Sequence, residues 1–447
     1  MAHYEKYKDS GVEWIGEIPE GWEVQKLKYI ADANPSNIDK KSKDNEDNVL
    51  LCNYVDVYKN EFISSELNFM KATASSDQIT KFILEKGDVI ITKDSETPDD
   101  IAAPALVAES FDNVVCGYHL THIKPKNING DFLFRYFQSK YLNSYFEVSA
   151  NGVTRYGLSV AKINSALILN PPRPDQTIIA NYLDRKTAEI DELIAQKERL
   201  LELYEEKKTA IINQAVTKGI DPDVKLKDSG IEWLGEIPDG WKIKRLRYLG
   251  SCQNGVSKGG EYFGSGFPFI SYGDVYNSFI LPQQVNGLAE STEDDRVNYS
   301  VRKGDILFTR TSETADEIGL TSTCLNTVKD AIFSGFLIRF RPNKNNLFEG
   351  FSKYYFSSKL HRLFFVKEMN LVTRASLSQE LLKKLPVVLP SIEEQKQIAL
   401  YLDESMEHIN AKIAKTQKII ELQKEYRTAL ISEVVTGKIK VTQEAAS

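Results

Sequence analysis

Apolar residues recur at alternating steps of four and three along two long stretches of the chain, and this spacing predicts two amphipathic helices. The first stretch runs from Ile178 to about Val216 and contains neither glycine nor proline. At 1.5 Å per residue, a helix of roughly 40 residues is on the order of 60 Å long. The second stretch repeats the pattern 219 residues later. The matching apolar positions are Leu183 and Leu402, Ile190 and Ile409, Ile194 and Ile413, and Leu201 and Ile420.

Start and stop signals agree with these two helices. Pro174 with Asp175 opens the first helix, and Ser391 has a glutamate three positions later, which is the spacing of a capping box. Gly219 and Gly437 stand where the helix ends are expected. Polar residues interrupt the middle of both stripes, but the stripes match. We therefore expect the helices to pack antiparallel as a coiled-coil spacer.

The remainder of the chain is a mixture of predicted strands and helices. Short β-rich runs at 89–92 and 306–309 follow Gly-Asp turns, and aromatic-rich runs at 132–137 and 351–356 are typical of buried helices. The expected fold class is α+β, with two repeated mixed α/β domains, two long antiparallel helices and pseudo-twofold symmetry. The expected boundaries are 1–173 for the first globular domain, 174–219 for the central helix, 220–390 for the second globular domain and 391–447 for the C-terminal helix.

An internal duplication underlies this organisation. Residues 8–22 read KDSGVEWIGEIPEGW and residues 227–241 read KDSGIEWLGEIPDGW, with 12 of 15 positions identical. The same offset of 219 relates Val153-Thr154-Arg155 to Val372-Thr373-Arg374 and Tyr182-Leu183-Asp184 to Tyr401-Leu402-Asp403. A period this long excludes a solenoid, so the repeated unit is a domain plus its helix.

Composition narrows the class of protein. Of the 447 residues 42% are hydrophobic and 27% charged, which excludes a disordered or collagen-like chain. No apolar run reaches the ~18 residues that span a bilayer. The four cysteines lie far apart, as expected of reduced thiols in a cytoplasmic protein. The net charge of −7 disfavours a protein that coats nucleic acid indiscriminately, but it allows local basic clefts.

The sequence Asn170-Pro171-Pro172-Arg173 is similar to the Asn-Pro-Pro-aromatic turn with which adenine-N6 methyltransferases hold a flipped base. Here the fourth residue is arginine, so the aromatic platform is missing, and the second copy reads Leu389-Pro390-Ser391-Ile392. The chain also has no Gly-rich cofactor loop and no phosphate-binding loop. We interpret this segment as a strand-to-helix turn.

Other candidates for chemistry are equally weak. His119 and His122 have no third ligand nearby and are expected to be ordinary core or loop residues. The acidic residues at 94, 96, 99 and 100 are expected to form a solvated loop rather than a nuclease centre. We therefore predict no catalytic residue and no metal site in this chain.

Polar and basic residues after strands and loops recur in both copies and suit DNA, because arginine reads guanine while serine, threonine and lysine hold phosphates. The alternative is that they form solvated turns with an arginine that defines the fold. The candidates in the first copy are Lys93, Ser95, Thr97, Thr154, Arg155 and Tyr156, and those in the second are Arg310, Ser312, Thr314, Thr373 and Arg374.

Taken together, the chain resembles the specificity subunit of type I restriction–modification enzymes over essentially its full length. The segments that carry the resemblance are GEIPEGW at 16–22 with GEIPDGW at 235–241, and PPRPDQTIIANYLD at 171–184 with PSIEEQKQIALYLD at 390–403.

This resemblance implies a non-catalytic DNA-recognition subunit, in which each globular domain is a target recognition domain for half of a bipartite, asymmetric site. It also implies double-stranded DNA, two methyltransferase subunits and motor-nuclease (restriction) subunits as partners, and a cytoplasmic location without membrane contact. S-adenosylmethionine, ATP and Mg²⁺ would belong to the partner subunits, with no cofactor in this chain. The helical residues expected to bind partners are Tyr182, Leu183, Ile190, Ile194, Leu201, Tyr401, Leu402, Ile409, Ile413 and Ile420.

Two other hypotheses stay open at this point. The chain could be a self-contained DNA adenine methyltransferase or nuclease, against which the missing cofactor loop argues. It could also be a coiled-coil scaffold that binds only proteins. A cofactor-binding assay on the isolated chain distinguishes a DNA-recognition subunit from a self-contained enzyme. Salt-dependent DNA binding in the presence of a methyltransferase partner distinguishes it from a scaffold that binds only proteins.

Overall fold

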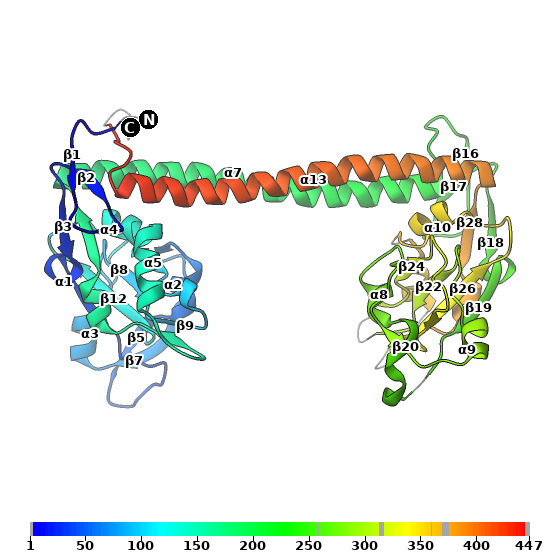
Figure 1. Cartoon of the computed structure of the whole chain (residues 1–447), viewed down its shortest axis with the longest axis horizontal. Helices are drawn as coiled ribbons and strands as arrows, with labels where there is room; N and C mark the ends of the chain where they lie inside the picture. Colours follow the sequence, from blue (N-terminus) through cyan, green and yellow to red (C-terminus); the bar gives the residue numbers. More distant parts are fainter. Residues whose placement is uncertain (1–2, 258, 313–316, 359, 369–374, 443–447) are drawn as a thin grey trace. The chain divides into compact units, whose positions relative to one another are not determined.

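The computed structural model of the chain describes residues 3–257, 259–312, 317–358, 360–368 and 375–442 (Figure 1). The chain forms two compact units. Unit 1 comprises residues 1–198 and 417–447, and unit 2 comprises residues 199–416. Each unit contains one globular domain of mixed helix and sheet, together with segments of both long helices.

The long helices are α7 (Arg173–Lys218) and α13 (Ile392–Val435). In unit 1, Lys424 lies 3.6 Å from Glu198, and Arg427 donates to Asp191 at 2.9 Å. Higher numbers on α13 thus meet lower numbers on α7, so the two segments pack antiparallel within this unit, as Figure 1 also shows. In unit 2, Val216 of α7 and Ile398 of α13 belong to one hydrophobic core.

The ends of both helices have the expected caps. Ser391 Oγ accepts a bond from the Glu394 amide at 3.3 Å, and the Glu394 carboxylate accepts one from the Ser391 amide at 2.9 Å. Gly219 and Gly437 adopt left-handed φ values of 78° and 73°, which end the helices. A Cβ at Gly437 would lie 2.5 Å from Pro19, because the end of α13 packs onto the opening segment of unit 1.

The globular domain of unit 1 is built on a five-stranded sheet in the order β4-β12-β8-β10-β6, antiparallel except for the β10–β6 pair. Its strands are β4 (Ala31–Pro35), β12 (Leu120–Pro125), β8 (Val89–Thr92), β10 (Pro104–Val107) and β6 (Phe62–Ile63).

Smaller sheets complete the globular domain of unit 1. They are β11-β5-β7, β13-β14-β9, β15-β3 and β1-β2. Their strands are β11 (Val114–Cys116), β5 (Asp47–Cys52), β7 (Met70–Ala74), β13 (Asn151–Gly152), β14 (Tyr156–Gly157), β9 (Asp94–Ser95), β15 (Leu167–Asn170), β3 (Glu23–Lys26), β1 (Tyr7–Asp9) and β2 (Glu17–Pro19).

Unit 2 repeats this plan on a four-stranded antiparallel sheet, β19-β26-β22-β24, with smaller sheets β21-β20-β25, β23-β27, β18-β28 and β16-β17. Its strands are β19 (Gly250–Asn254), β26 (Leu337–Pro342), β22 (Ile306–Thr309), β24 (Thr321–Thr323), β21 (Leu288–Ala289), β20 (Phe263–Ile270), β25 (Ile332–Phe333), β23 (Thr311–Ser312), β27 (Ala375–Ser376), β18 (Lys242–Arg245), β28 (Pro386–Leu389), β16 (Leu226–Asp228) and β17 (Glu236–Pro238).

Short helices cover these sheets, and several begin with a side chain that caps the first turn, as Ser75, Asn129 and Ser271 do. In unit 1 they are α1 (Leu27–Ile30), α2 (Tyr54–Lys59), α3 (Ser76–Phe82), η1 (Pro98–Asp100), α4 (Gly130–Phe137), α5 (Lys140–Ser149) and α6 (Val160–Ser165). In unit 2 they are η2 (Leu246–Tyr248), η3 (Gly260–Tyr262), α8 (Tyr272–Tyr276), α9 (Glu293–Asn298), α10 (Glu349–Tyr355), α11 (Leu360–Glu368) and α12 (Gln379–Lys384).

The aromatic-rich runs form the buried helices α4 and α10, as expected. Phe132, Phe134 and Phe137 of α4 are fully buried, and so is Phe351 of α10. Burial of these rings against the sheets gives each globular domain its own core. Among the described residues, no helix is long and apolar enough to cross a membrane.

Candidate nucleic-acid interface

One buried strand in each unit carries a basic residue to the surface. Strands β8 and β22 are buried along their whole length and end in a threonine, Thr92 or Thr309. The Thr92 hydroxyl accepts a bond from the Ala103 amide at 3.0 Å, and the Thr309 hydroxyl accepts one from the Leu320 amide at 2.9 Å. These bonds fix the strand ends, so the next residues, Lys93 and Arg310, stand at defined positions.

The two loop signatures predicted from the sequence lie side by side in unit 1. Strand β9 pairs with β14 so that Ser95 faces Tyr156. The carbonyl of Lys93 accepts a bond from the Leu158 amide at 2.8 Å. Residues 93–97 and 154–156, separated by some 60 positions in the sequence, therefore form one surface.

Unit 2 has the same arrangement. Strand β23 pairs with β27, with Ser312 opposite Ala375, and the carbonyl of Arg310 accepts a bond from the Leu377 amide at 2.8 Å. Arg310 thus takes the structural place of Lys93. The frame is repeated although its side chains differ.

In unit 1, a single carboxylate gathers two potential base-reading groups. Arg155 donates from Nε and Nη2 to Oδ1 of Asp94, at 3.0 and 2.5 Å, and His119 Nδ1 lies 2.6 Å from Oδ2. Lys93 Nζ lies 4.6 Å from the centre of the Tyr118 ring, which is 47% exposed. We call these five residues the unit 1 corner. Asp94 fixes Arg155 without covering it, since the arginine side chain remains 56% exposed.

The corresponding unit 2 corner consists of Arg310, Gly335 and Phe336. The Arg310 amide donates to the Phe336 carbonyl at 2.9 Å, just as the Lys93 amide donates to the His119 carbonyl at 3.0 Å. Phe336 therefore stands where unit 1 has His119. Arg310 Nη1 donates to the Gly335 carbonyl at 3.3 Å, and the Phe336 side chain is 61% exposed.

The remaining candidates of the sequence analysis are less uniform. Thr97 and Thr154 are exposed and Tyr156 is half-buried, whereas Ser95 is buried and its hydroxyl accepts a bond from the Thr97 amide at 3.4 Å. Ser312 lies in β23. The candidates Thr314, Thr373 and Arg374 lie outside the described residues.

Sequence reasoning missed five residues of the two corners as candidates for DNA contact: Asp94, Tyr118, His119, Gly335 and Phe336. Asp94 was expected in a solvated acidic loop, but it is half-buried and binds two basic side chains. Aligning the copies by the offset of 217 that relates β8 to β22 would have paired His119 with Phe336. That alignment carries no sign of exposure, which only the fold supplies.

His122 and the segment 170–173, two candidates for chemistry in the sequence, are held by hydrogen bonds within the fold. His122 is buried, with Nε2 2.7 Å from Asp88 Oδ2. The segment 170–173 is the turn between β15 and α7, and the buried Gln176 side chain donates to the Asn170 side chain at 2.8 Å and to the Pro171 carbonyl at 2.7 Å. Across the described ranges, no group of three or more His, Cys, Asp or Glu residues could hold a metal ion.

Most of the predicted partner-binding positions on the long helices face inward. Those that are buried within their own unit are Leu183, Ile190, Ile194, Leu402, Ile409 and Ile420. Tyr182, Leu201 and Ile413 are half-buried, and Tyr401 is 42% exposed. Other apolar side chains are exposed instead: Leu193, Leu203, Leu400, Leu422 and Tyr426.

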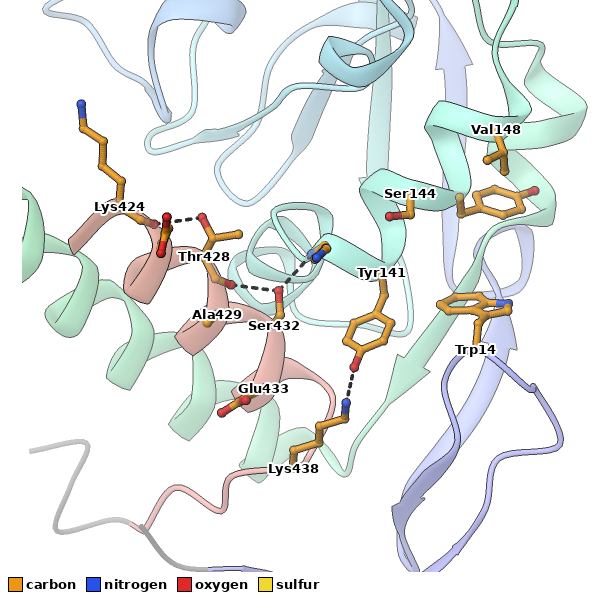
Figure 2. A pocket seen from close by; sticks show the side chains of 13 residues that line it. Trp14, Tyr141, Ser144, Val148, Lys424, Thr428, Ala429, Ser432, Glu433 and Lys438 are labelled. Carbon is orange, nitrogen blue, oxygen red and sulfur yellow. Dashed lines mark hydrogen bonds between the residues drawn. The ribbon is translucent and has the colours of Figure 1, made fainter. Parts of the chain in front are cut away.

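Unit 1 also contains a groove of about 1200 Å³ between α5, the C-terminal part of α13 and the loop that carries Trp14 (Figure 2). Trp14 stacks on Tyr141 with ring centres 6.2 Å apart, and Lys438 donates to the Tyr141 hydroxyl. Ser432 Oγ accepts a bond from the Lys140 amide at 3.0 Å, which joins the two helices at the base of the groove.

The profile of the type I restriction modification DNA specificity domain matches residues 19–203 and again residues 238–424. The chain belongs to this family. It is a specificity subunit with two DNA specificity domains, the DNA-recognition component of an enzymatic complex.

Relatives and solved structures agree with this assignment. A putative type I restriction enzyme MjaX specificity subunit from Methanocaldococcus jannaschii is 23% identical, over 96% of both chains. The EcoKI specificity subunit from Escherichia coli K12 is also 23% identical, over 94% of this chain and 91% of its own. The HsdS subunit from Thermoanaerobacter tengcongensis has the same fold, with a TM-score of 0.56 and 18% identity over 94% of this chain and 98% of its own. A chain from a study of type I restriction–modification assembly gives a TM-score of 0.72, with 17% identity over 94% and 99% of the two chains.

Proposed function

We propose that each globular domain of this specificity subunit reads one half of a bipartite, asymmetric DNA site through its corner. The observation that carries this proposal is the pairing of β9 with β14 and of β23 with β27, which brings the two polar-basic signatures together in each unit. A common frame with different side chains suits two readers of different sequence. Arginine beside exposed aromatic or hydroxyl groups provides both base and phosphate contacts.

The partner-binding role extends this proposal to the helices. Leu203 and Leu422 are repeat partners, and they are 45% and 50% exposed. An exposed leucine at the same position of each copy suits two copies of one partner, so we propose that two methyltransferase subunits dock there. Those subunits would supply S-adenosylmethionine chemistry, and restriction subunits would supply ATP- and Mg²⁺-dependent cleavage. Because the substrate would be DNA inside the cell, we propose that the complex works in the cytoplasm.

The groove of unit 1 would enlarge one of these docking surfaces. Glu425 and Ala429 line the groove, and each stands three residues after an exposed apolar side chain, Leu422 or Tyr426. Residues three apart on a helix are neighbours on its surface. The groove and the exposed leucine therefore form a continuous surface on α13.

The proposal is tested with the full chain, reconstituted with the methyltransferase subunit of its host. Methylation-sensitive sequencing of the host genome supplies the recognition site. The complex should bind a duplex with this site far more tightly than a scrambled duplex at moderate salt, and changing either half-site should remove the preference.

The chain alone should not methylate or cleave DNA. Turnover of S-adenosylmethionine by the chain without partners would contradict the proposal, as would site-specific binding that depends on only one half-site. Leu203→Asp and Leu422→Asp, tested singly and together, should each remove one methyltransferase subunit from the complex, as measured by native mass.

A further inference from the structure

The unit 2 corner presents a bare aromatic ring where the unit 1 corner presents a polar one. Phe336 is 61% exposed, although it stands directly before the fully buried start of β26. Among the exposed phenylalanines, which include Phe62, Phe263 and Phe279 at 41–46%, Phe336 is the most exposed of the described residues. Such a ring suits an apolar group on the ligand.

The backbone around Phe336 is held on several sides. The Phe336 amide donates to the Ser334 hydroxyl at 3.3 Å, and the Gly335 amide donates to the Val256 carbonyl at 2.8 Å. A Cβ at Gly335 would lie 2.5 Å from the Ser257 hydroxyl and 3.2 Å from the Val256 carbonyl, so the segment at 256–257 packs directly against this turn. The ring is therefore displayed by a rigid turn.

Arg310 is bonded to the backbone turn that carries this ring, and it supplies the charge that DNA requires. Its amide bonds to the Phe336 carbonyl, and its guanidinium bonds to the Gly335 carbonyl. The basic group and the apolar ring therefore share one small surface. On the base edges in the major groove, the 5-methyl group of thymine is the apolar feature that such a ring can contact.

We infer that Phe336 is a specificity-determining residue that recognises the 5-methyl group of a thymine in the half-site read by unit 2. This inference rests on the proposed function. In unit 1 the same position holds His119, whose ring is bound to Asp94. Recognition of a thymine methyl group by this position is therefore expected in only one of the two half-sites.

The test uses the full chain with its methyltransferase partner and duplexes in which each thymine of both half-sites is replaced singly by deoxyuridine. This replacement removes only the methyl group. For the wild type, replacing one particular thymine of one half-site should lower the affinity about fourfold. This factor corresponds to the free energy gained by burying one methyl group. Phe336→Ala should bind both duplexes equally weakly, and Phe336→Leu should keep part of the discrimination.

Tyr248→Ala is the matched control, because Tyr248 is 66% exposed and precedes Gly250, which pairs with Pro342 at the other end of β26. Phe336 precedes Leu337 at the first end, roughly 20 Å away at ~3.4 Å per residue. The control should discriminate thymine from uracil like the wild type. Unchanged melting temperatures show that the variants fold.

Three results would overturn the inference: no thymine in either half-site, no response to uracil, or a response that persists in Phe336→Ala. A variant that weakens binding without altering the response to uracil would instead make Phe336 a wedge between base steps. If the wild type fails to prefer its site over scrambled DNA, the proposed function fails first, and the two failures are thereby distinguished.

Discussion

The two units share a frame but join their globular domain to the helices by different chemistry. In unit 1, the buried Arg135 donates to Asp184 at 2.8 Å and to Glu61 at 3.2 Å, and Arg427 of α13 donates to Glu61 at 2.5 Å. In unit 2, Asp403, the repeat partner of Asp184, accepts bonds from Lys353 and Tyr354, both at 2.5 Å.

These junctions also set the acidity of their members. Burial raises the pKa of Asp184, and the opposing charge of Arg135 reduces that rise. Burial lowers the pKa of Arg427, but its bonds to Asp191 and Glu61 outweigh burial and raise the pKa overall. In unit 2, burial and then the bond to Asp403 raise the pKa of Tyr354. The aspartate of the Tyr-Leu-Asp motif is thus kept in both copies while its partner changes.

The difference shows which parts of the repeat the frame constrains. The aspartate and the opening tryptophans serve the packing of helix on domain, so they recur. The same holds for the buried repeat partners Gln176 and Gln395, which accept bonds from the Asn129 and Phe348 amides at 2.7 and 2.8 Å. The corner residues do not pack the helices on the domain, and they differ between the two units. Variants that act on one unit alone test whether the junction residues serve stability and the corner residues serve DNA binding.

The largest expected effect comes from Arg135→Ala. The arginine side chain is 1% exposed, and its loss leaves Glu61 and Asp184 without their shared cation. We expect unit 1 to lose about 2–4 kcal/mol of stability, a value lowered because both carboxylates are partly exposed. Hydrogen exchange should accelerate in unit 1 peptides only.

Lys353→Ala is the corresponding variant of unit 2 and should accelerate exchange there instead. Equal acceleration in both units by either variant would show that the two units unfold together, and the comparison between separate junctions would then be wrong.

The second-largest effect is expected on DNA binding by the corners. Arg155→Ala should weaken binding through the first half-site by about 1–3 kcal/mol if the arginine makes a bidentate base contact. Competition with duplexes altered in one half-site measures this loss. Arg310→Ala should act on the other half-site. A lowered melting temperature with unchanged affinity would assign Arg155 to the fold.

A smaller difference is expected between the two opening tryptophans. Trp241 Nε1 donates to Glu394 at 3.2 Å, whereas the buried Trp22 Nε1 has no hydrogen-bond partner among the described residues. At the position of Glu394, unit 1 has the shorter Asp175. Trp241→Phe should therefore cost about 1 kcal/mol more than Trp22→Phe. Thermal unfolding of the two variants gives this difference, and equal costs would rule out the bond.

The smallest expected effect is a difference in the rates at which the four thiols react with a labelling reagent. Burial raises the pKa of Cys252 to about 11 and that of Cys324 to about 12, and it raises the pKa of Cys52 and Cys116 as well. At pH 8 Cys252, which is partly exposed, should react first but slowly, and its rate should rise toward pH 11. Cys252→Ser should remove this first phase of labelling. If the phase persists in the variant, one of the other three cysteines must be exposed by local opening of the fold.

The sign of the pH dependence follows from the same shifts. An unfolded thiol ionises near its ordinary pKa, and the folded thiols of unit 2 ionise at a higher pH. Their contribution to stability is complete below about pH 8.5 and is lost as the pH rises through 11 to 12. Alkaline unfolding should therefore be shallower in Cys252→Ser.

Much of the fold follows from local patterns in the sequence. The helix ends at Gly219 and Gly437, the capping box at Ser391 and the buried helices α4 and α10 all depend on neighbouring residues. The antiparallel pairing of helix segments follows from matching stripes. The stripe predicts that Leu183 and Ile190 lie on an apolar face, but it does not show which segments cover that face.

The corners depend on pairing between distant segments, which no local pattern encodes. Lys93 and Arg155 were found as separate signatures, but their union through Asp94 and the strand pair β9–β14 needs the folded chain. Tyr118 and Phe336 were missed because exposure of an aromatic side chain is a tertiary property.

The division of unit 1 between residues 1–198 and 417–447 has a consequence for biosynthesis. On the ribosome, unit 2 is contiguous and can be completed as soon as residue 416 has emerged, whereas the first domain must wait for the later segment that carries Arg427 and the buried Leu430 and Val434. Until then the unit 1 segment of α7 lacks the α13 segment that packs against it, and Asp191 lacks its arginine. The nascent domain is thus open to chaperones and proteases for the time needed to translate some 200 further codons, and a prematurely terminated chain would be recognised through it.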